Sequence, residues 1–207
     1  GDRRGARAAV AGAWSGGHRA VVGGGARAGY VGFVGGAGPF GLLLCAVRKA
    51  EGLTVIVSEL SEARKSIAGA TGAADHVLDP SKDDVVARVH ELTAGQGADV
   101  AFECSSVNAV LDQLLDGVRP GGVVDNVWSW GHPATVDMQK LVLQESDLRG
   151  TIAYVRDHPG TIKLVKDGKV DLAPFISARI PLDKLIEDGF ETLIHHNETA
   201  VKIIVHP

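Results

Sequence analysis

Three glycines at fixed spacing, Gly36, Gly38 and Gly41, constrain the fold of this chain more than any other feature. They separate a short apolar segment, 31–35, from a longer apolar segment, 40–50, as a tight turn between a strand and a helix would. The first glycine allows the bend, the second lets a phosphate approach the backbone, and the third lets helix and strand pack closely. The pattern therefore predicts the first βαβ unit of a dinucleotide-binding domain.

Strand-like and helix-like segments continue to alternate up to about residue 130, and Ser61 is a suitable N-cap for one of the helices. Short connections and apolar strands are typical of a parallel sheet buried on both faces. We therefore expect a doubly wound α/β fold with a parallel sheet, the Rossmann fold. Its expected strands are 31–35, 54–58, 74–78, 99–104 and 123–128, the last after a turn at 119–122, and its expected helices are 40–50, 61–70, 83–93 and 108–118.

The pattern is looser after residue 130. There we expect a short helix around 141–143, a strand at 150–154, a helix at 161–169, and then a strand at 177–180, a helix at 182–193 and a strand at 200–205. We assign 30–170 to the dinucleotide-binding domain and 171–207 to an amphipathic C-terminal tail. Residues 1–29 are rich in Gly, Ala and Arg, a composition that we expect to leave them disordered.

Composition excludes several classes of function. A net charge of −4 gives no general attraction to nucleic acid, and no stretch is long and apolar enough to predict a membrane span. Two cysteines without a CxxC spacing favour a reducing compartment, so we expect a cytoplasmic protein. Because Met138 is the only methionine, we expect the chain to be a fragment or a processed form.

Glu59 follows the second expected strand and lies 18 residues after Gly41. A carboxylate at this place accepts hydrogen bonds from the ribose hydroxyls of adenosine and repels a 2′-phosphate, which favours NAD over NADP. Arg64, five residues further on, is a candidate for stacking on the adenine and, as the less favoured choice, for meeting a 2′-phosphate. The alternatives are a solvated loop acid and a surface arginine.

Further candidate cofactor contacts lie where expected strands end, because ligands of open α/β sheets gather at the carboxyl edge. For Cys104 we also weigh a plain buried thiol, since no basic residue adjoins it in the sequence. The full predicted set for the cofactor is Gly36, Gly38, Pro39, Phe40, Gly41, Glu59, Arg64, Cys104, Ser105 and Val127; we assign no catalytic residue and no metal ligand.

Longer motifs resemble the medium-chain dehydrogenase/reductase family, and within it the zinc-dependent butanediol and sorbitol-type polyol dehydrogenases. The resemblance covers the chain from about Val31 to the C-terminus. It is carried by Gly-Gly-Ala-Gly-Pro-Phe-Gly (35–41), Val-Ser-Glu-Leu-Ser-Glu-Ala-Arg (57–64), Gly-Ala-Ala-Asp-His-Val-Leu-Asp-Pro (72–80) and Gly-Ala-Asp-Val-Ala-Phe-Glu-Cys (97–104).

This resemblance implies NAD-linked oxidation of a secondary alcohol or diol, usually by homo-oligomers, with a zinc ion held by an N-terminal GroES-like domain. Neither the Gly-Cys-Gly nor the Gly-His-Glu motif of that domain occurs here, so we expect the domain to be missing and turnover to be weak or absent. The chain also departs from the family at Ser106, where a glycine is expected, and at Asp125, where an apolar residue is expected.

Two alternatives remain open from the sequence. The chain could be a non-catalytic module that binds NAD or forms oligomers. It could also be a methyltransferase, whose nucleoside site likewise uses glycines after the first strand and an acid after the second; Gly41 and the long helix–strand alternation count against it.

Overall fold

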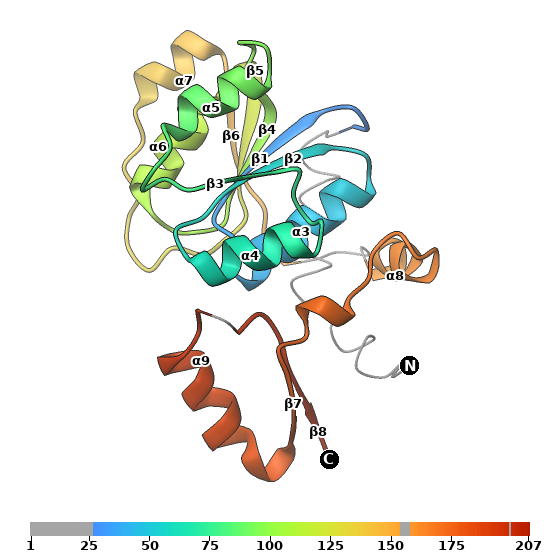
Figure 1. Ribbon diagram of the computed structural model, residues 1–207. Helices are drawn as coiled ribbons and strands as arrows, with labels where there is room; N and C mark the ends of the chain where they lie inside the picture. The colour runs from blue at the N-terminus through green and yellow to red at the C-terminus, as the bar shows by residue number, and fades with distance from the viewer. Residues whose placement is uncertain (1–26, 154–157, 199) are drawn as a thin grey trace.

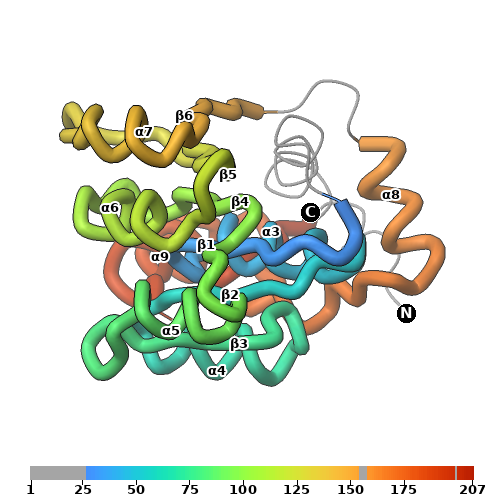
Figure 2. Tube along the Cα trace, turned by 90° about the horizontal axis from the view of Figure 1, so that it is seen from above, coloured from blue at the N-terminus to red at the C-terminus, as the bar shows by residue number. Residues whose placement is uncertain are grey.

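A computed structural model describes residues 27–153, 158–198 and 200–207. Most of the leader predicted at 1–29 therefore lies outside the described residues. In the described part, the main sheet has six parallel strands in the order β3-β2-β1-β4-β5-β6 (Figures 1 and 2). The strands are β1 (Val31–Gly35), β2 (Thr54–Ser58), β3 (His76–Leu78), β4 (Ala98–Glu103), β5 (Val118–Asn126) and β6 (Asp147–Gly150).

The predicted doubly wound α/β fold is confirmed. The chain runs outward from β1 to β3, crosses back to β4, and then runs to β6, so the order reverses between β1 and β4. The glycine turn follows β1 directly at this reversal, which is where open α/β sheets bind ligands.

Both faces of the sheet are buried by helices. One apolar cluster joins the sheet to α3 (Pro39–Ala50), α4 (Glu62–Ala70) and α8 (His158–Lys166). The other joins the opposite face to α5 (Val85–Leu92), α6 (Asn108–Gly117) and α7 (Met138–Gln144). The apolar runs in the strands are explained by this layering. In β2, for example, Val55 and Val57 belong to the first cluster and Ile56 to the second.

Local sequence signals set the starts of several helices. The Ser61 hydroxyl accepts a hydrogen bond from the Arg64 N–H at 3.4 Å, which confirms the predicted N-cap of α4. Asp84 caps α5 and Asp137 caps α7 in the same way. Helix α3 starts at Pro39, whose missing N–H is tolerated at a first helical position.

Two strand predictions were wrong in their limits. Strand β5 begins at Val118 rather than at 123, because Val118 pairs with Ala98 and residues 119–122 then bulge opposite Asp99 before pairing resumes at Val123. Strand β6 ends at Gly150, where the sequence predicted a strand to begin. It is an exposed edge strand, so it carries no apolar pattern that would have located it.

The C-terminal tail forms a second, two-stranded parallel sheet of β7 (Ala178–Pro181) and β8 (Ile203–His206). The helix predicted at 182–193 is wrong as a single element. Its residues divide into a 3-10 turn η2 (Leu182–Lys184), a π-helical segment η3 (Leu185–Phe190) and α9 (Glu191–His195), preceded by a 3-10 turn η1 (Ala173–Phe175). Gly189 lies in the π-helical segment, where an added Cβ would come within 3.2 Å of Ile180 in β7.

The tail is a distinct lobe on the carboxyl-edge side of the main sheet (Figure 1). Its apolar anchor consists of Leu172, Phe175 and Val201, which join the core cluster on the α3 face together with the preceding Val170. Among the described residues, no helix combines the length and apolar character needed to cross a bilayer.

Gly41→Ala tests the close packing between α3 and the glycine turn. A Cβ at Gly41 would lie 2.0 Å from the Gly36 carbonyl oxygen, a backbone atom that cannot rotate away. We expect the free energy of unfolding, measured in urea, to fall by about 2 kcal/mol or more. The matched control is Gly69→Ala in α4, where a Cβ meets no atom within 4 Å and stability should rise slightly. Equal effects of the two substitutions would contradict this packing.

Candidate dinucleotide site

Each of the three glycines in the turn lacks a side chain for a different structural reason. Gly36 has a φ of +97°, a left-handed conformation that favours glycine. Gly41 needs the absence of a side chain because of its contact with the Gly36 carbonyl. A Cβ on Gly38 would meet no protein atom within 4 Å, so its absence leaves open space rather than relieving a clash. The turn is therefore built to leave room beside Gly38.

Glu59 joins this turn to the end of β2. Its Oε2 accepts the Ala37 N–H at 2.7 Å, and its Oε1 accepts the Ser61 N–H at 2.8 Å. The residue is only 9% exposed. Each carboxylate oxygen can accept more than one hydrogen bond, so acceptor positions remain for a ligand hydroxyl.

A cavity of about 300 Å³ lies between the turn, the end of β2 and the start of α6. Six of the predicted site residues line it, namely Gly36, Gly38, Glu59, Arg64, Cys104 and Ser105. Its lining also includes Ser58, Leu60, Pro80, Val107 and Val110, which the sequence analysis missed. Ser58 and Pro80 end or follow expected strands, and that position would have identified them.

The other four predicted residues lie beside the cavity. Pro39, Phe40 and Gly41 form the first turn of α3, whose N-terminal end carries unpaired N–H groups and a partial positive charge. Val127 follows β5 and is buried, and its N–H donates to the Glu103 carbonyl at 3.1 Å. Val127 therefore supports the edge of the sheet.

Phe40 reaches the segment after β5. Its ring packs against that of Trp128, with centroids 5.8 Å apart and the planes tilted by 52°. This aromatic surface of Phe40 and Trp128 joins the first turn of α3 to the segment that follows β5. No local pattern indicated it, because the two rings come from segments 88 positions apart.

Glu103 shapes the loop after β4. Its Oε1 accepts the backbone N–H groups of Ser105 and Ser106, at 2.7 and 2.9 Å, together with the Ser105 hydroxyl. Ser106 has a φ of +60°, the conformation in which the family resemblance expects a glycine. Its hydroxyl donates to the Ser129 carbonyl at 3.0 Å, a bond that a glycine would lack. The serine thus ties this loop to the segment after β5.

Asp125 is fully buried, and the structure supplies part of the partner set that a buried carboxylate requires. Its Oδ2 accepts the Thr151 hydroxyl at 3.0 Å, while burial raises the pKa of the carboxyl group. The guanidinium of Arg48 lies over the Phe102 ring at 4.4 Å on the same face and lowers that pKa in part. Asp125 belongs to the packing under α3 and does not line the cavity.

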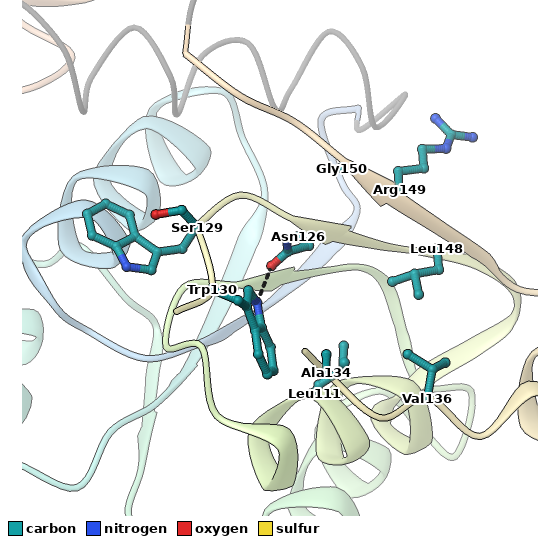
Figure 3. Close-up of a pocket in the computed structure, with 10 residues that line it drawn as sticks. Leu111, Asn126, Ser129, Trp130, Ala134, Val136, Leu148, Arg149 and Gly150 are labelled. Atoms are coloured by element: carbon teal, nitrogen blue, oxygen red, sulfur yellow. Dashed lines mark hydrogen bonds between the residues drawn. The ribbon is translucent and has the colours of Figure 1, made fainter. Parts of the chain in front are cut away.

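A second hollow, of about 510 Å³, lies on the α6 face at the ends of β5 and β6 (Figure 3). The Trp130 indole forms one wall, and its N–H donates to the Asn126 side chain at 2.9 Å. Leu111, Val136 and Leu148 form the opposite, apolar side. Trp128 and Ser129 also line this hollow, so Phe40 packs against one of its lining residues.

The described residues contain no group of three or more His, Cys, Asp and Glu side chains that could hold a metal ion. The glycine turn, the Glu59 carboxylate and the cavity beside them offer the chemistry that a dinucleotide needs.

Known proteins show which family this chain belongs to. A family profile described as zinc-binding dehydrogenase matches residues 39–167. The chain belongs to the zinc-binding dehydrogenase family.

Two individual relatives of this chain are of one type. It is 58% identical over 171 residues to (R,R)-butanediol dehydrogenase of Neisseria gonorrhoeae, covering 83% of this chain and 48% of the relative. It is 39% identical to (R,R)-butanediol dehydrogenase of Bacillus subtilis, covering 82% and 49%. The chain thus spans about half the length of these relatives.

Solved structures agree with the fold. The crystal structure of 2R,3R-butanediol dehydrogenase from Bacillus subtilis superposes with a TM-score of 0.88 at 35% identity, over 94% of this chain and 56% of that chain. A putative zinc-binding dehydrogenase from Sinorhizobium meliloti, solved with NADP, has a TM-score of 0.82 at 24% identity and covers 97% and 59%.

Thiol reactivity provides a test of how strongly Cys45 and Cys104 are buried. Burial raises the pKa of Cys45 to about 12 and the pKa of Cys104 well above its usual value. Both should therefore stay protonated at pH 8 and react with a disulfide reagent about a thousandfold more slowly than in the denatured chain. Rapid labelling of Cys104 in the folded protein would show a reactive thiolate there instead.

Proposed function

We propose that this chain binds NAD and forms the cofactor-binding part of a butanediol-dehydrogenase-like alcohol dehydrogenase. The observation that carries the proposal is the cavity bounded by the open Gly38 position on one side and the Glu59 carboxylate on the other. A diphosphate needs free N–H groups and close backbone approach, and a ribose needs an acceptor for its hydroxyls. Family membership and the names of the relatives support the same cofactor class and leave the methyltransferase alternative without support.

The proposed NAD lies across the carboxyl edge of the sheet. Glu59 binds the adenosine ribose, and the N–H groups of Gly38 and Phe40 hold the diphosphate. The Phe40–Trp128 aromatic surface then supports the nicotinamide end. Bound NAD supplies the hydride acceptor for a secondary alcohol or diol. The protein contributes orientation of the ring and exclusion of water from one of its faces.

We also propose that the 207-residue chain alone turns over alcohols weakly or not at all. Hydride loss from an alcohol requires a group that lowers the pKa of its hydroxyl, and the described residues near Trp128 hold no metal-binding cluster for that role. We also propose that residues 30–170 form the cofactor domain and residues 171–207 the tail. We propose a cytoplasmic location, which the two free cysteines favour.

Calorimetric titration with NAD tests the proposal. Glu59→Gln keeps an acceptor for the Ala37 N–H but removes the charge, so we expect affinity to fall about tenfold. Gly38→Val fills the open position beside the cavity and should abolish binding while the fold persists. Glu91→Gln, an exposed acid on α5, is the matched control and should bind like the parent chain.

Two titration results would contradict the proposed NAD site. Tight NAD binding by Gly38→Val, or binding of S-adenosylmethionine in preference to NAD, would contradict the proposed site. Robust oxidation of butanediol by the purified chain without added metal would contradict weak turnover but would leave NAD binding standing.

A second candidate function is an oligomerisation module, and one surface favours it. Strand β6 is an exposed edge of the sheet, and α7 beside it buries none of its residues. Val142 and Leu143 on α7 are 72% and 75% exposed. Exposed apolar surface next to an unpaired strand edge favours association.

Sedimentation velocity tests this second candidate. If the α7–β6 surface forms a dimer, Val142→Lys with Leu143→Lys should convert the dimer to a monomer and leave NAD affinity within about twofold. A parent chain that is monomeric at all concentrations would rule the module out.

A further inference from the structure

We infer that the C-terminal tail takes part in cofactor choice, because Asn197 holds Arg64, a cavity-lining cation that could otherwise receive a 2′-phosphate. The inference rests on the proposed NAD site, since it concerns the adenosine end of the same cavity. It adds a second determinant to Glu59, on a segment that is remote in the sequence.

Arg64 is the residue that joins the cavity to the tail. It lines the cavity from the first turn of α4. Its Nη2 donates to the Asn197 carbonyl at 3.1 Å and to the Asn197 side-chain oxygen at 3.4 Å, across 133 positions of sequence. Asn197 lies in the turn that follows α9. The guanidinium therefore bonds to neutral acceptors on the tail.

Two lysines on neighbouring segments, Lys65 and Lys82, are engaged by acids. Lys65 contacts Glu62 at 2.9 Å and also pairs with Asp79. Lys82 lies 3.1 Å from each of the same two acids. These pairs raise the pKa of both lysines and lower the pKa of both acids, so all four groups are charged and balanced near neutral pH.

A 2′-phosphate would bring roughly two negative charges close to the Glu59 carboxylate. Its binding would need a compensating cation, and Arg is the side chain best suited to phosphate oxygens. Only Arg64 among these three cations is bonded to uncharged acceptors, so it alone could be redirected without breaking an ion pair. The strength of its bond to Asn197 should therefore set how well NADP competes with NAD.

Two substitutions at Asn197 change that strength in opposite directions. Asn197→Ala removes the side-chain acceptor, and Asn197→Asp replaces it with a carboxylate that binds Arg64 more tightly. Asn197 is exposed, so both variants should fold. We expect the ratio of NADP to NAD affinity, from calorimetric titration, to rise about two- to fivefold in the first and to fall in the second.

Arg64→Met provides the matched background. It separates an effect of Asn197 that acts through Arg64 from a direct effect of the residue at position 197 on the cofactor. In that background Asn197→Ala should leave the ratio unchanged, and the double-mutant cycle should show coupling between the two positions. NAD binding without any response of the ratio to Asn197, or the same response in the Arg64→Met background, would overturn the inference alone. Absence of NAD binding in the parent chain would overturn the proposed function as well.

Discussion

The hydrogen bond from the Ala37 N–H to the Glu59 carboxylate joins the two βα units on which the site depends. It fixes the glycine turn after β1 relative to the end of β2, and the second carboxylate oxygen holds the Ser61 N–H at the start of α4. The acid that we propose as the ribose acceptor is thus already positioned by the turn that we propose as the diphosphate site. The glycine turn and the acid therefore form one unit beside the open position at Gly38.

The sequence predicted the buried part of the fold well, since burial on both faces leaves a distinct pattern. Strands β1 and β2 have the predicted limits, and Ser61 caps α4 as expected. Prediction failed where burial stops. Strand β6 is exposed along its length, and β5 starts before a bulge that only its pairing with Ala98 defines. In the tail, a segment with helical period contains Gly189 packed close to β7 and forms mixed helical turns.

The candidate site likewise contains residues that the sequence predicted and contacts that it did not predict. Gly36, Gly38 and Glu59, which a local pattern identified, line one cavity. Contacts between remote segments left no signal in the sequence: the Phe40–Trp128 ring pair, the bond from Ser106 to Ser129, and the bond from Arg64 to Asn197. Ser106 was noted only as a departure from the family pattern. The fold shows that its left-handed backbone is accompanied by bonds to Glu103 and to the loop after β5.

Hydrogen–deuterium exchange with and without NAD tests the central claim, a single dinucleotide site between the glycine turn and Glu59. The account predicts that NAD slows exchange of backbone amides in residues 36–41, 58–64 and 104–107, and also in 127–129, where Trp128 supports the nicotinamide end. Little change is expected on the far side of the Trp130 hollow, in residues 134–136 and 148–150. Unchanged exchange in residues 36–41 at saturating NAD, or protection confined to the Trp130 hollow, would contradict it.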